Sequence, residues 1–165
     1  MTVSEGTGDT VNPLQVRPLA ICLFRNGDRI LVGEGYDVVK KQVYYRPLGG
    51  AIEFGEFSHD AIVREIREEL GAEITNLRYL TTLETVFTCD GQPGHEVVIV
   101  YEAAFVDKSI YEKPALSGIE DGGLHFEAVW KPLEDFLSGD PPLYPEGLLE
   151  FLLKSANQTP SDNTP

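Results

Sequence analysis

The hydrophobic period of this 165-residue chain changes from strand-like to helical at Ser58. After that point Ile62, Ile66 and Leu70 recur at four-residue spacing, and Gly71 follows where a helix can end. Ser58 is also a candidate N-cap, because its hydroxyl can accept a hydrogen bond from a backbone N–H of the first turn. The sequence therefore predicts one helix in the middle of the chain, between segments of a different kind.

Strand-like segments rich in β-branched and aromatic residues lie on both sides of this helix. Asn26-Gly27 is a strong hairpin signal between RPLAICLF and RILVGEGY, and VYYRPLG is another short strand. After the helix come LRYLTTLETVFTC, EVVIVYEAAFV and FEAVWKPL, then a short helix in PLEDFL and a C-terminal helix in YPEGLLEFLLK. DKSIYEKPALSGIEDGG is a long connection with no clear period. This order predicts an α/β or α+β sandwich, in which helices pack on a mixed sheet.

The length and composition fit one globular domain, with 42% apolar and 24% charged residues. Residues 1–15 are polar and rich in glycine, and we expect a flexible N-terminal segment there. Residues 155–165, SANQTPSDNTP, are typical of a disordered tail. The folded domain is therefore expected to span residues 16–154.

The formal net charge of −14, from 27 acidic and 13 basic residues, disfavours long nucleic acids and anionic membranes. A small anionic ligand remains compatible with this charge if metal cations accompany it. The sequence has two cysteines, no basic-then-apolar leader and no apolar run of about 18 residues. We expect a cytoplasmic protein with a small-molecule partner.

Three glutamates of the predicted helix have the spacing of a shared face, namely Glu65, Glu68 and Glu69. Carboxylates held together repel, and the pKa of at least one should rise unless cations are present. Mg²⁺ prefers carboxylate oxygens combined with water and phosphate oxygens, so the cluster predicts a metal site. The alternative is a solvated acidic face, partly neutralised by Arg64 and Arg67.

The residues before the helix complete a longer pattern. Gly50 is followed after five residues by Glu56, and seven residues later come Arg64, Glu65, Ile66, Glu68, Glu69 and Gly71. This pattern resembles the Nudix box of the MutT-like Nudix hydrolases, and a weaker likeness extends from Val16 to Leu153. The last position departs from the family, since Ala72 replaces a bulky aliphatic residue, which concerns packing at the helix end.

The resemblance implies a Nudix-type α/β/α sandwich and hydrolysis, dependent on Mg²⁺ or Mn²⁺, of a nucleoside diphosphate linked to another moiety. It implies that Glu65, Glu68 and Glu69 bind the metal, with the carbonyl of Gly49 as a further ligand. Gly50 and Gly71 would support the shape of the site, and Glu56 and Arg64 resemble the family's structural pair. Two further roles are outer-sphere metal binding by Glu56 and phosphate binding by Arg46.

The general base stays open at this stage. Glu69 and Glu120 are equally good candidates and Glu96 comes next, with Asp121 and Glu127 as further possibilities. The aromatic residues that could stack on a base are Tyr36, Tyr44, Tyr45, Phe54 and Phe87.

Two other functions and one assembly are compatible with the sequence. The domain could bind a nucleotide metabolite as a sensor without cleaving it, although a pure binder has no need of three carboxylates. Isomerase chemistry on an isoprenoid diphosphate is a weaker alternative, because Cys22 and Cys89 lie far from the box in sequence. A homodimer is also possible, since many relatives pair.

Overall fold

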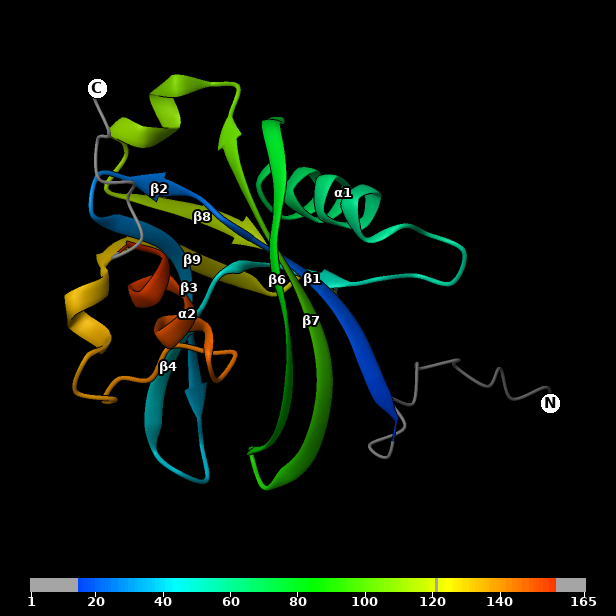
Figure 1. The fold of residues 1–165 in the computed structure, drawn as a ribbon, viewed down its shortest axis with the longest axis vertical. Coiled ribbons are helices and arrows are strands. Elements are labelled where there is room, and N and C mark those ends of the chain that lie inside the picture. Colours follow the sequence, from blue (N-terminus) through cyan, green and yellow to red (C-terminus); the bar gives the residue numbers. More distant parts are fainter. Residues whose placement is uncertain (1–14, 121, 157–165) are drawn as a thin grey trace, which may run out of the picture.

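The computed structural model describes residues 15–120 and 122–156, which form two β-sheets and two α-helices (Figure 1). The first sheet has the order β5 (Leu48–Ala51), β1 (Val16–Leu23), β7 (Gln92–Phe105), β6 (Ile74–Cys89). The second has the order β2 (Arg25–Asn26), β3 (Arg29–Asp37), β9 (His125–Pro132), β8 (Ala115–Ile119), and β4 (Gln42–Arg46) pairs with β3. The helices are α1 (Ser58–Leu70), α2 (Leu148–Ala156) and two 3₁₀ helices, η1 (Lys108–Glu112) and η2 (Leu133–Phe136).

The first sheet is mixed, because β1 is parallel to β7 and antiparallel to β5. β6 and β7 form a long antiparallel hairpin, and β3 and β4 form a second one in the other sheet. In Figure 1 these two hairpins extend in the same direction from the centre of the molecule. The predicted α+β class with a mixed sheet and packed helices is confirmed.

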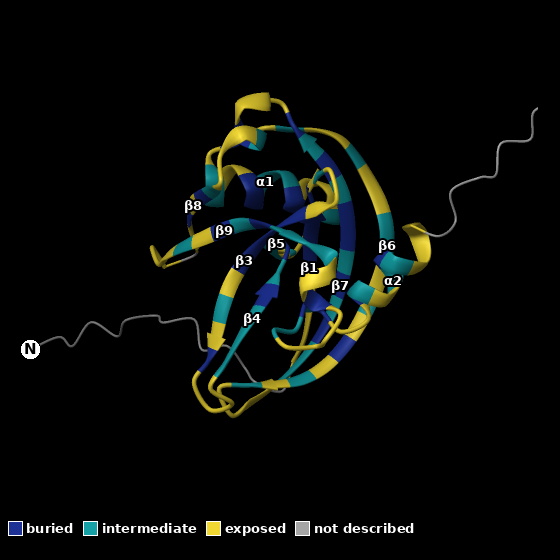
Figure 2. Ribbon diagram, turned by 90° about the vertical axis from the view of Figure 1, so that its left-hand side faces the viewer, coloured by how far each residue is buried: buried dark blue, intermediate teal, exposed yellow. Residues whose placement is uncertain are grey.

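Strand β1 is apolar on both faces because each face meets a different helix-covered cluster. Ala20, Cys22 and Phe24 belong to a core cluster with Ile62 and Ile66 of α1. The alternate residues Leu19, Ile21 and Leu23 belong to a second cluster with Leu148 and Leu152 of α2. Residues i and i+2 of a strand share a face, so one continuous apolar run serves two cores (Figure 2).

Helix α1 has the bounds that the hydrophobic period predicts, but its N-terminus is built differently. Phe57 occupies the N-cap position without a side-chain cap hydrogen bond. The Ser58 hydroxyl instead lies 2.7 Å from the hydroxyl of Tyr101 on β7, so the prediction that Ser58 caps the helix is wrong. Gly71 ends the helix in a left-handed conformation, with its N–H donating to the Arg67 carbonyl at 2.9 Å.

Two other local predictions change in detail. Asn26 pairs with Arg29, so the hairpin turn consists of Gly27 and Asp28, one residue later than the sequence signal suggested. The long connection after β7 contains η1 and β8, a strand too short and too weakly alternating to stand out in the sequence.

Helix α2 continues through Ala156, two residues into the segment predicted as a tail. The remainder of that segment, and the predicted flexible region before residue 15, lie outside the described residues. Within the described ranges, none of the helices has the length and apolar character that crossing a bilayer requires.

Candidate active site

Gly49 and Gly50, the two central residues of β5, bring this strand unusually close to its neighbours. A Cβ added to Gly49, whose φ is 137°, would lie 2.1 Å from the Ala20 carbonyl oxygen. A Cβ added to Gly50 would lie 2.5 Å from Cδ of the Glu65 carboxylate. Real Cβ atoms do not make such contacts, so Gly49 lets β5 lie close to β1 and Gly50 lets Glu65 lie against β5.

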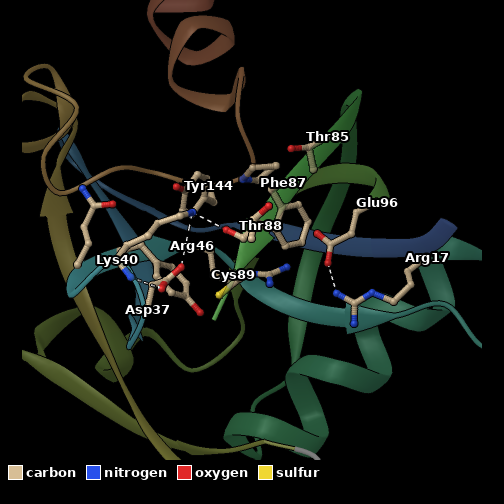
Figure 3. Close-up of a pocket in the computed structure, with 13 residues that line it drawn as sticks. Arg17, Asp37, Lys40, Arg46, Thr85, Phe87, Thr88, Cys89, Glu96 and Tyr144 are labelled. Atoms are coloured by element: carbon tan, nitrogen blue, oxygen red, sulfur yellow. Dashed lines mark hydrogen bonds and ion pairs between the residues drawn. The ribbon is translucent and has the colours of Figure 1, made fainter. Parts of the chain in front are cut away.

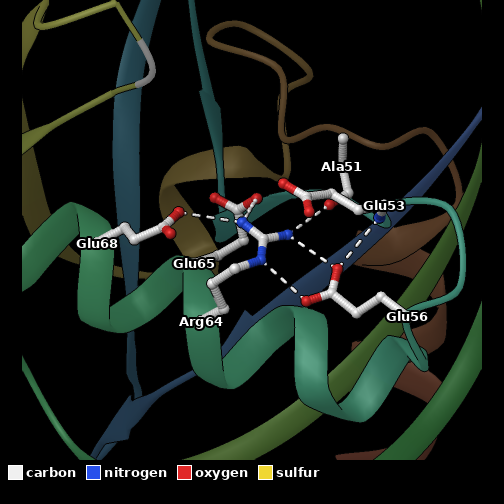
Figure 4. A network of polar contacts seen from close by, with 6 residues as sticks. All are labelled: Ala51, Glu53, Glu56, Arg64, Glu65 and Glu68. Atoms are coloured by element: carbon white, nitrogen blue, oxygen red, sulfur yellow. Dashed lines mark hydrogen bonds and ion pairs between the residues drawn. The ribbon is translucent and has the colours of Figure 1, made fainter.

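Arg64 joins the loop before α1 to the acidic face of the helix (Figure 4). Its Nε donates to Glu56 Oε1 at 2.9 Å, and its Nη2 donates to Glu56 Oε2 at 3.0 Å. Nη2 also donates to the Ala51 carbonyl at 2.9 Å. Nη1 reaches Glu65 Oε1 at 2.8 Å and Glu68 Oε2 at 3.0 Å. The contact expected between Glu56 and Arg64 is therefore present as a bidentate pair.

These ion pairs shift the pKa values of both partners in the expected directions. The hydrogen bonds from Arg64 lower the pKa of Glu56, with help from the Glu53 backbone N–H at 3.1 Å. The same contacts, first those with Glu56, raise the pKa of Arg64 further above its ordinary value. Glu56 is thus held ionised and directed at the loop.

The three box glutamates do not share one environment. Glu65 is buried, Glu69 is half-buried, and Glu68 is exposed at the side where Arg64 lies. Glu65 and Glu69 line a cavity of about 310 Å³ together with Gly49, Gly50 and other residues. The single acidic patch predicted from helical spacing is therefore split between a cavity and its surroundings.

Glu69 is the least satisfied carboxylate in the cavity. Its Oε2 is buried and has no hydrogen-bond partner among the described residues. Burial, and then the nearby charges of Glu65 and Glu120, raise the pKa of Glu69 to about 8. A Gly49 backbone hydrogen bond and the charge of Arg46 act in the opposite direction. A cation near this oxygen would relieve both the desolvation and the repulsion.

Arg46 and Glu120 complete the cavity from two other elements. Arg46 is the last residue of β4, and Glu120 follows the end of β8. The Glu120 backbone N–H donates to the Leu124 carbonyl at 2.8 Å, a hydrogen bond within the loop between β8 and β9. The structure therefore brings Glu120 and Arg46, distant in sequence, beside Glu65 and Glu69.

The other sequence candidates lie elsewhere. Glu96 lines an adjoining cavity, where it forms an ion pair with Arg17. Glu127 is exposed on β9, and Asp121 lies outside the described residues. Sequence reasoning missed Arg17, which lines both cavities, although a lone arginine just before the apolar run of β1 was a visible signal.

The carboxylates of the cavity that Glu65 and Glu69 line fit a hard divalent cation. Glu65 and Glu69 offer oxygen ligands, which Mg²⁺ and Mn²⁺ prefer, and a cation could satisfy the Glu69 oxygen that lacks a partner among the described residues. Asp37, Cys89 and Asp90 form another group, with ligand atoms within 4.8 Å of one another. The Asp37 carboxylate already accepts backbone N–H bonds from Val39, Lys40 and Asp90, so that group is the poorer metal site.

Comparison with known proteins gives a consistent family match. The family model described as NUDIX domain matches residues 14–151. The NAD-capped RNA hydrolase NudC of Pseudomonas aeruginosa PAO1 is 31% identical over 107 residues, covering 65% of this chain and 35% of the relative. The protein of the same name from Pseudomonas putida W619 is 31% identical over 129 residues, covering 78% and 40%. The chain thus spans two fifths or less of the length of these curated relatives.

Solved structures support the fold. A MutT NUDIX hydrolase from Burkholderia pseudomallei has a TM-score of 0.58 at 22% identity, covering 85% of this chain and 97% of that one. A NUDIX hydrolase from Nitrosomonas europaea has a TM-score of 0.62 at 15% identity, covering 87% and 90%. At this identity the likeness concerns the arrangement of helices and strands.

Proposed function

Because this chain belongs to the NUDIX domain family, we propose that it is a divalent-metal-dependent pyrophosphohydrolase acting on a nucleoside diphosphate linked to another moiety. One observation carries the proposal. A buried oxygen of Glu69 has no hydrogen-bond partner among the described residues, and it lies in a cavity that Glu65, Glu120 and Arg46 also line. Burying carboxylates without compensating charges lowers the stability of a protein. The burial becomes favourable when a cation and a phosphate bind in the cavity together.

The residues in and around the cavity have separate proposed roles in binding the metal and the phosphates. Glu65 and Glu69 would hold the metal, and the Gly49 carbonyl and the exposed Glu68 would supply further ligands. The absence of a side chain at Gly50 leaves room for the Glu65 carboxylate. When bound, the divalent cation supplies charge neutralisation for the diphosphate and a lower pKa for the attacking water. Arg46 also lines the cavity and would bind the phosphate oxygens with its planar guanidinium.

Glu120 is the proposed general base. It lines the same cavity as Glu69 but belongs to a different element, so it can take a proton without giving up a metal ligand. The water oxygen bonds to one phosphorus, its proton passes to the Glu120 carboxylate, and the anhydride P–O bond breaks. The bridging oxygen leaves with the second phosphate, which gives a nucleoside monophosphate and a phosphorylated product.

The relatives named NAD-capped RNA hydrolase point to dinucleotide linkages as substrates. The formal charge of −14 favours a free dinucleotide over a long RNA, because RNA binding depends on basic side chains that contact phosphates. We therefore propose a small compound of the NAD type, in which a diphosphate joins two ring-bearing nucleosides.

The deciding experiment incubates the full chain with Mg²⁺ and NAD, ADP-ribose, a dinucleoside polyphosphate or a nucleotide sugar, and separates the products chromatographically. We expect cleavage of at least one compound, loss of cleavage with EDTA, and a decrease of about a hundredfold or more in Glu69→Gln. Oxygen-18 water would assign the attacked phosphorus. Tight binding of one compound without any turnover would support a nucleotide sensor instead.

A further inference from the structure

A second cavity of about 200 Å³ adjoins the carboxylate cavity and shares Arg17, Tyr44 and Arg46 with it. It is considerably larger than the space of about 30 Å³ that one water molecule occupies in the liquid. Its walls come from the β3–β4 hairpin and the β6–β7 hairpin (Figure 3), which belong to different sheets. A ligand group in this cavity would therefore be continuous with a diphosphate beside Glu65 and Glu69.

The strand register explains why these side chains meet. On one hairpin Tyr44 pairs with Gly35, and on the other Phe87 pairs with Gly94. Thr85 lies two residues before Phe87, and Glu96 lies two residues after Gly94. Thr85 and Glu96 also pair with each other, on the same face of the hairpin as Phe87 and Gly94. Residues two apart in a strand point to the same side, so each hairpin presents one aromatic ring and polar neighbours to the cavity.

Each aromatic ring lies directly over a glycine of the neighbouring strand. A Cβ at Gly35 would lie 2.3 Å from Cζ of Tyr44, and a Cβ at Gly94 would lie 2.4 Å from Cζ of Phe87. The missing side chains allow both rings to lie along their sheets. The Tyr44 ring is also in contact with Tyr144, at a centroid distance of 5.6 Å. Rings in this position offer a face for a planar group.

Glu96 adds a charged acceptor to this aromatic cavity. Its side chain is only 4% exposed, and Arg17, its register partner on β1, forms an ion pair with Oε1. Figure 3 shows the Glu96 carboxylate beside the Phe87 ring, with Arg17 on its other side. A carboxylate fixed in this way can accept a hydrogen bond from an N–H group at the edge of a ring that stacks on Phe87.

The cations of the cavity are distributed unevenly. At the end formed by the hairpin turns, Lys40 donates to the Thr88 carbonyl and lies 3.5 Å from Asp37 Oδ2, so its charge is already compensated. Arg17 and Arg46 lie where the two cavities join. Arg17 is ion-paired with Glu96, so the charge left for an anion at this junction is that of Arg46. Phosphate binding is therefore favoured at the junction, and an uncharged planar group is favoured between the rings.

We propose that this second cavity binds a heteroaromatic ring of the substrate between Phe87 and Tyr44, and that Glu96 selects rings with an exocyclic N–H donor. The proposal rests on the proposed function, because it assumes that the diphosphate occupies the carboxylate cavity. The amino group of adenine and the carboxamide of nicotinamide both meet this requirement. Glu96 is thus a specificity-determining residue, and the reaction itself takes place in the neighbouring cavity.

The first test measures binding of mononucleotides to the full chain by isothermal titration calorimetry with Mg²⁺. AMP or nicotinamide mononucleotide should bind at least about tenfold more tightly than ribose 5-phosphate, and the stronger of the two identifies the ring. Phe87→Leu, which keeps apolar volume but removes the ring, should abolish most of that advantage. Tyr36→Leu is the matched control, because Tyr36 is 54% exposed and does not line the cavity. Equal affinities for all three ligands would overturn the proposal.

The second test concerns Glu96. AMP is compared with purine riboside 5′-monophosphate, and nicotinamide mononucleotide with nicotinic acid mononucleotide, since the second compound of each pair lacks the exocyclic N–H. Glu96→Gln should reduce the preference for the first compound about fivefold, because a charged acceptor makes the stronger hydrogen bond. A preference that is absent in the wild type, or unchanged in the variant, would contradict the assignment of Glu96.

Hydrolysis assays on the same proteins separate this inference from the proposed function. Ring-dependent binding without cleavage of any diphosphate compound would refute the hydrolase and retain the ring site. If the protein cleaves a diphosphate compound and Phe87→Leu changes the KM no more than Tyr36→Leu does, the hydrolase is retained and the ring site is refuted.

Discussion

The Glu65 carboxylate occupies the space that a side chain at Gly50 would need, with the added Cβ only 2.5 Å from Glu65 Cδ. The two residues belong to different elements, α1 and β5. The glycine therefore does more than allow a turn, since it determines where a buried carboxylate of the candidate metal site can lie. A substitution at Gly50 therefore tests whether the position of the Glu65 carboxylate matters for the reaction.

Gly50→Ala should displace the Glu65 carboxylate and lower hydrolysis by about a hundredfold, because misplacement of a reacting group by about 1 Å has effects of that size. The overall fold should survive, which circular dichroism and thermal unfolding would verify. Steady-state kinetics on the best compound of the panel gives the activity. Wild-type rates in a well-folded variant would show that the position of Glu65 does not matter for the reaction.

Glu69→Gln should weaken Mn²⁺ binding at least tenfold, since even changes to outer-sphere groups alter metal affinity by about 10- to 100-fold. Binding is measured on the full chain by electron paramagnetic resonance of free Mn²⁺. Glu73→Gln removes an exposed carboxylate just beyond the helix and is the matched control. The metal assignment fails if both variants bind Mn²⁺ as the wild type does.

Arg64→Lys keeps the charge but loses the planar group that contacts Glu56, Ala51, Glu65 and Glu68. We expect a lower melting temperature, corresponding to about 1–2 kcal/mol, and a lower turnover. Arg67→Lys is the control, because Arg67 is exposed and is not among the residues that Arg64 contacts. Equal losses in the two variants would mean that the network contributes nothing specific.

Glu120→Gln should reduce kcat by about a hundredfold or more while Mn²⁺ affinity stays close to that of the wild type, as expected for a proton acceptor. Glu127→Gln, on the exposed part of β9, should leave kcat unchanged. The comparison requires single-turnover measurements, so that product release does not hide the chemical step. If Glu120→Gln retains full kcat, Glu69 becomes the preferred base.

Asp37 links the two hairpin turns, and hydrogen bonds from the Lys40, Asp90 and Val39 backbone N–H groups lower its pKa below the ordinary value of 3.8. A carboxyl with a lowered pKa in the folded state stabilises the fold above the pKa of the unfolded state, and this contribution disappears as pH falls through the folded value. Asp37→Asn should therefore melt at a lower temperature than the wild type at pH 7, and the difference should shrink below pH 3.8.

Thermal unfolding of both proteins from pH 7 to pH 3 measures this difference. Asp28→Asn, in the exposed turn between β2 and β3, corrects for general effects of removing an acidic charge. If the difference in melting temperature between Asp37→Asn and wild type does not depend on pH, the stabilisation comes from the shape of the Asp37 side chain and not from its charge.

The sequence by itself determined the local part of this protein. The four-residue spacing of Ile62, Ile66 and Leu70 and the stop at Gly71 predicted α1 within its observed bounds, because helix geometry depends on neighbouring residues. The contact between Glu56 and Arg64 was also foreseeable, since it joins residues within one short segment. The family resemblance of the box added the candidate metal ligands.

Only the tertiary structure decided how distant residues combine. Helical spacing placed Glu65, Glu68 and Glu69 on one face, but packing buried Glu65, half-buried Glu69 and left Glu68 exposed. Sheet pairing likewise brought Glu96 to Arg17 in a second cavity, whereas Glu120 came to Glu69 in the first. Burial and long-range contacts depend on which surfaces the whole chain brings together, and a local pattern carries no information about that choice.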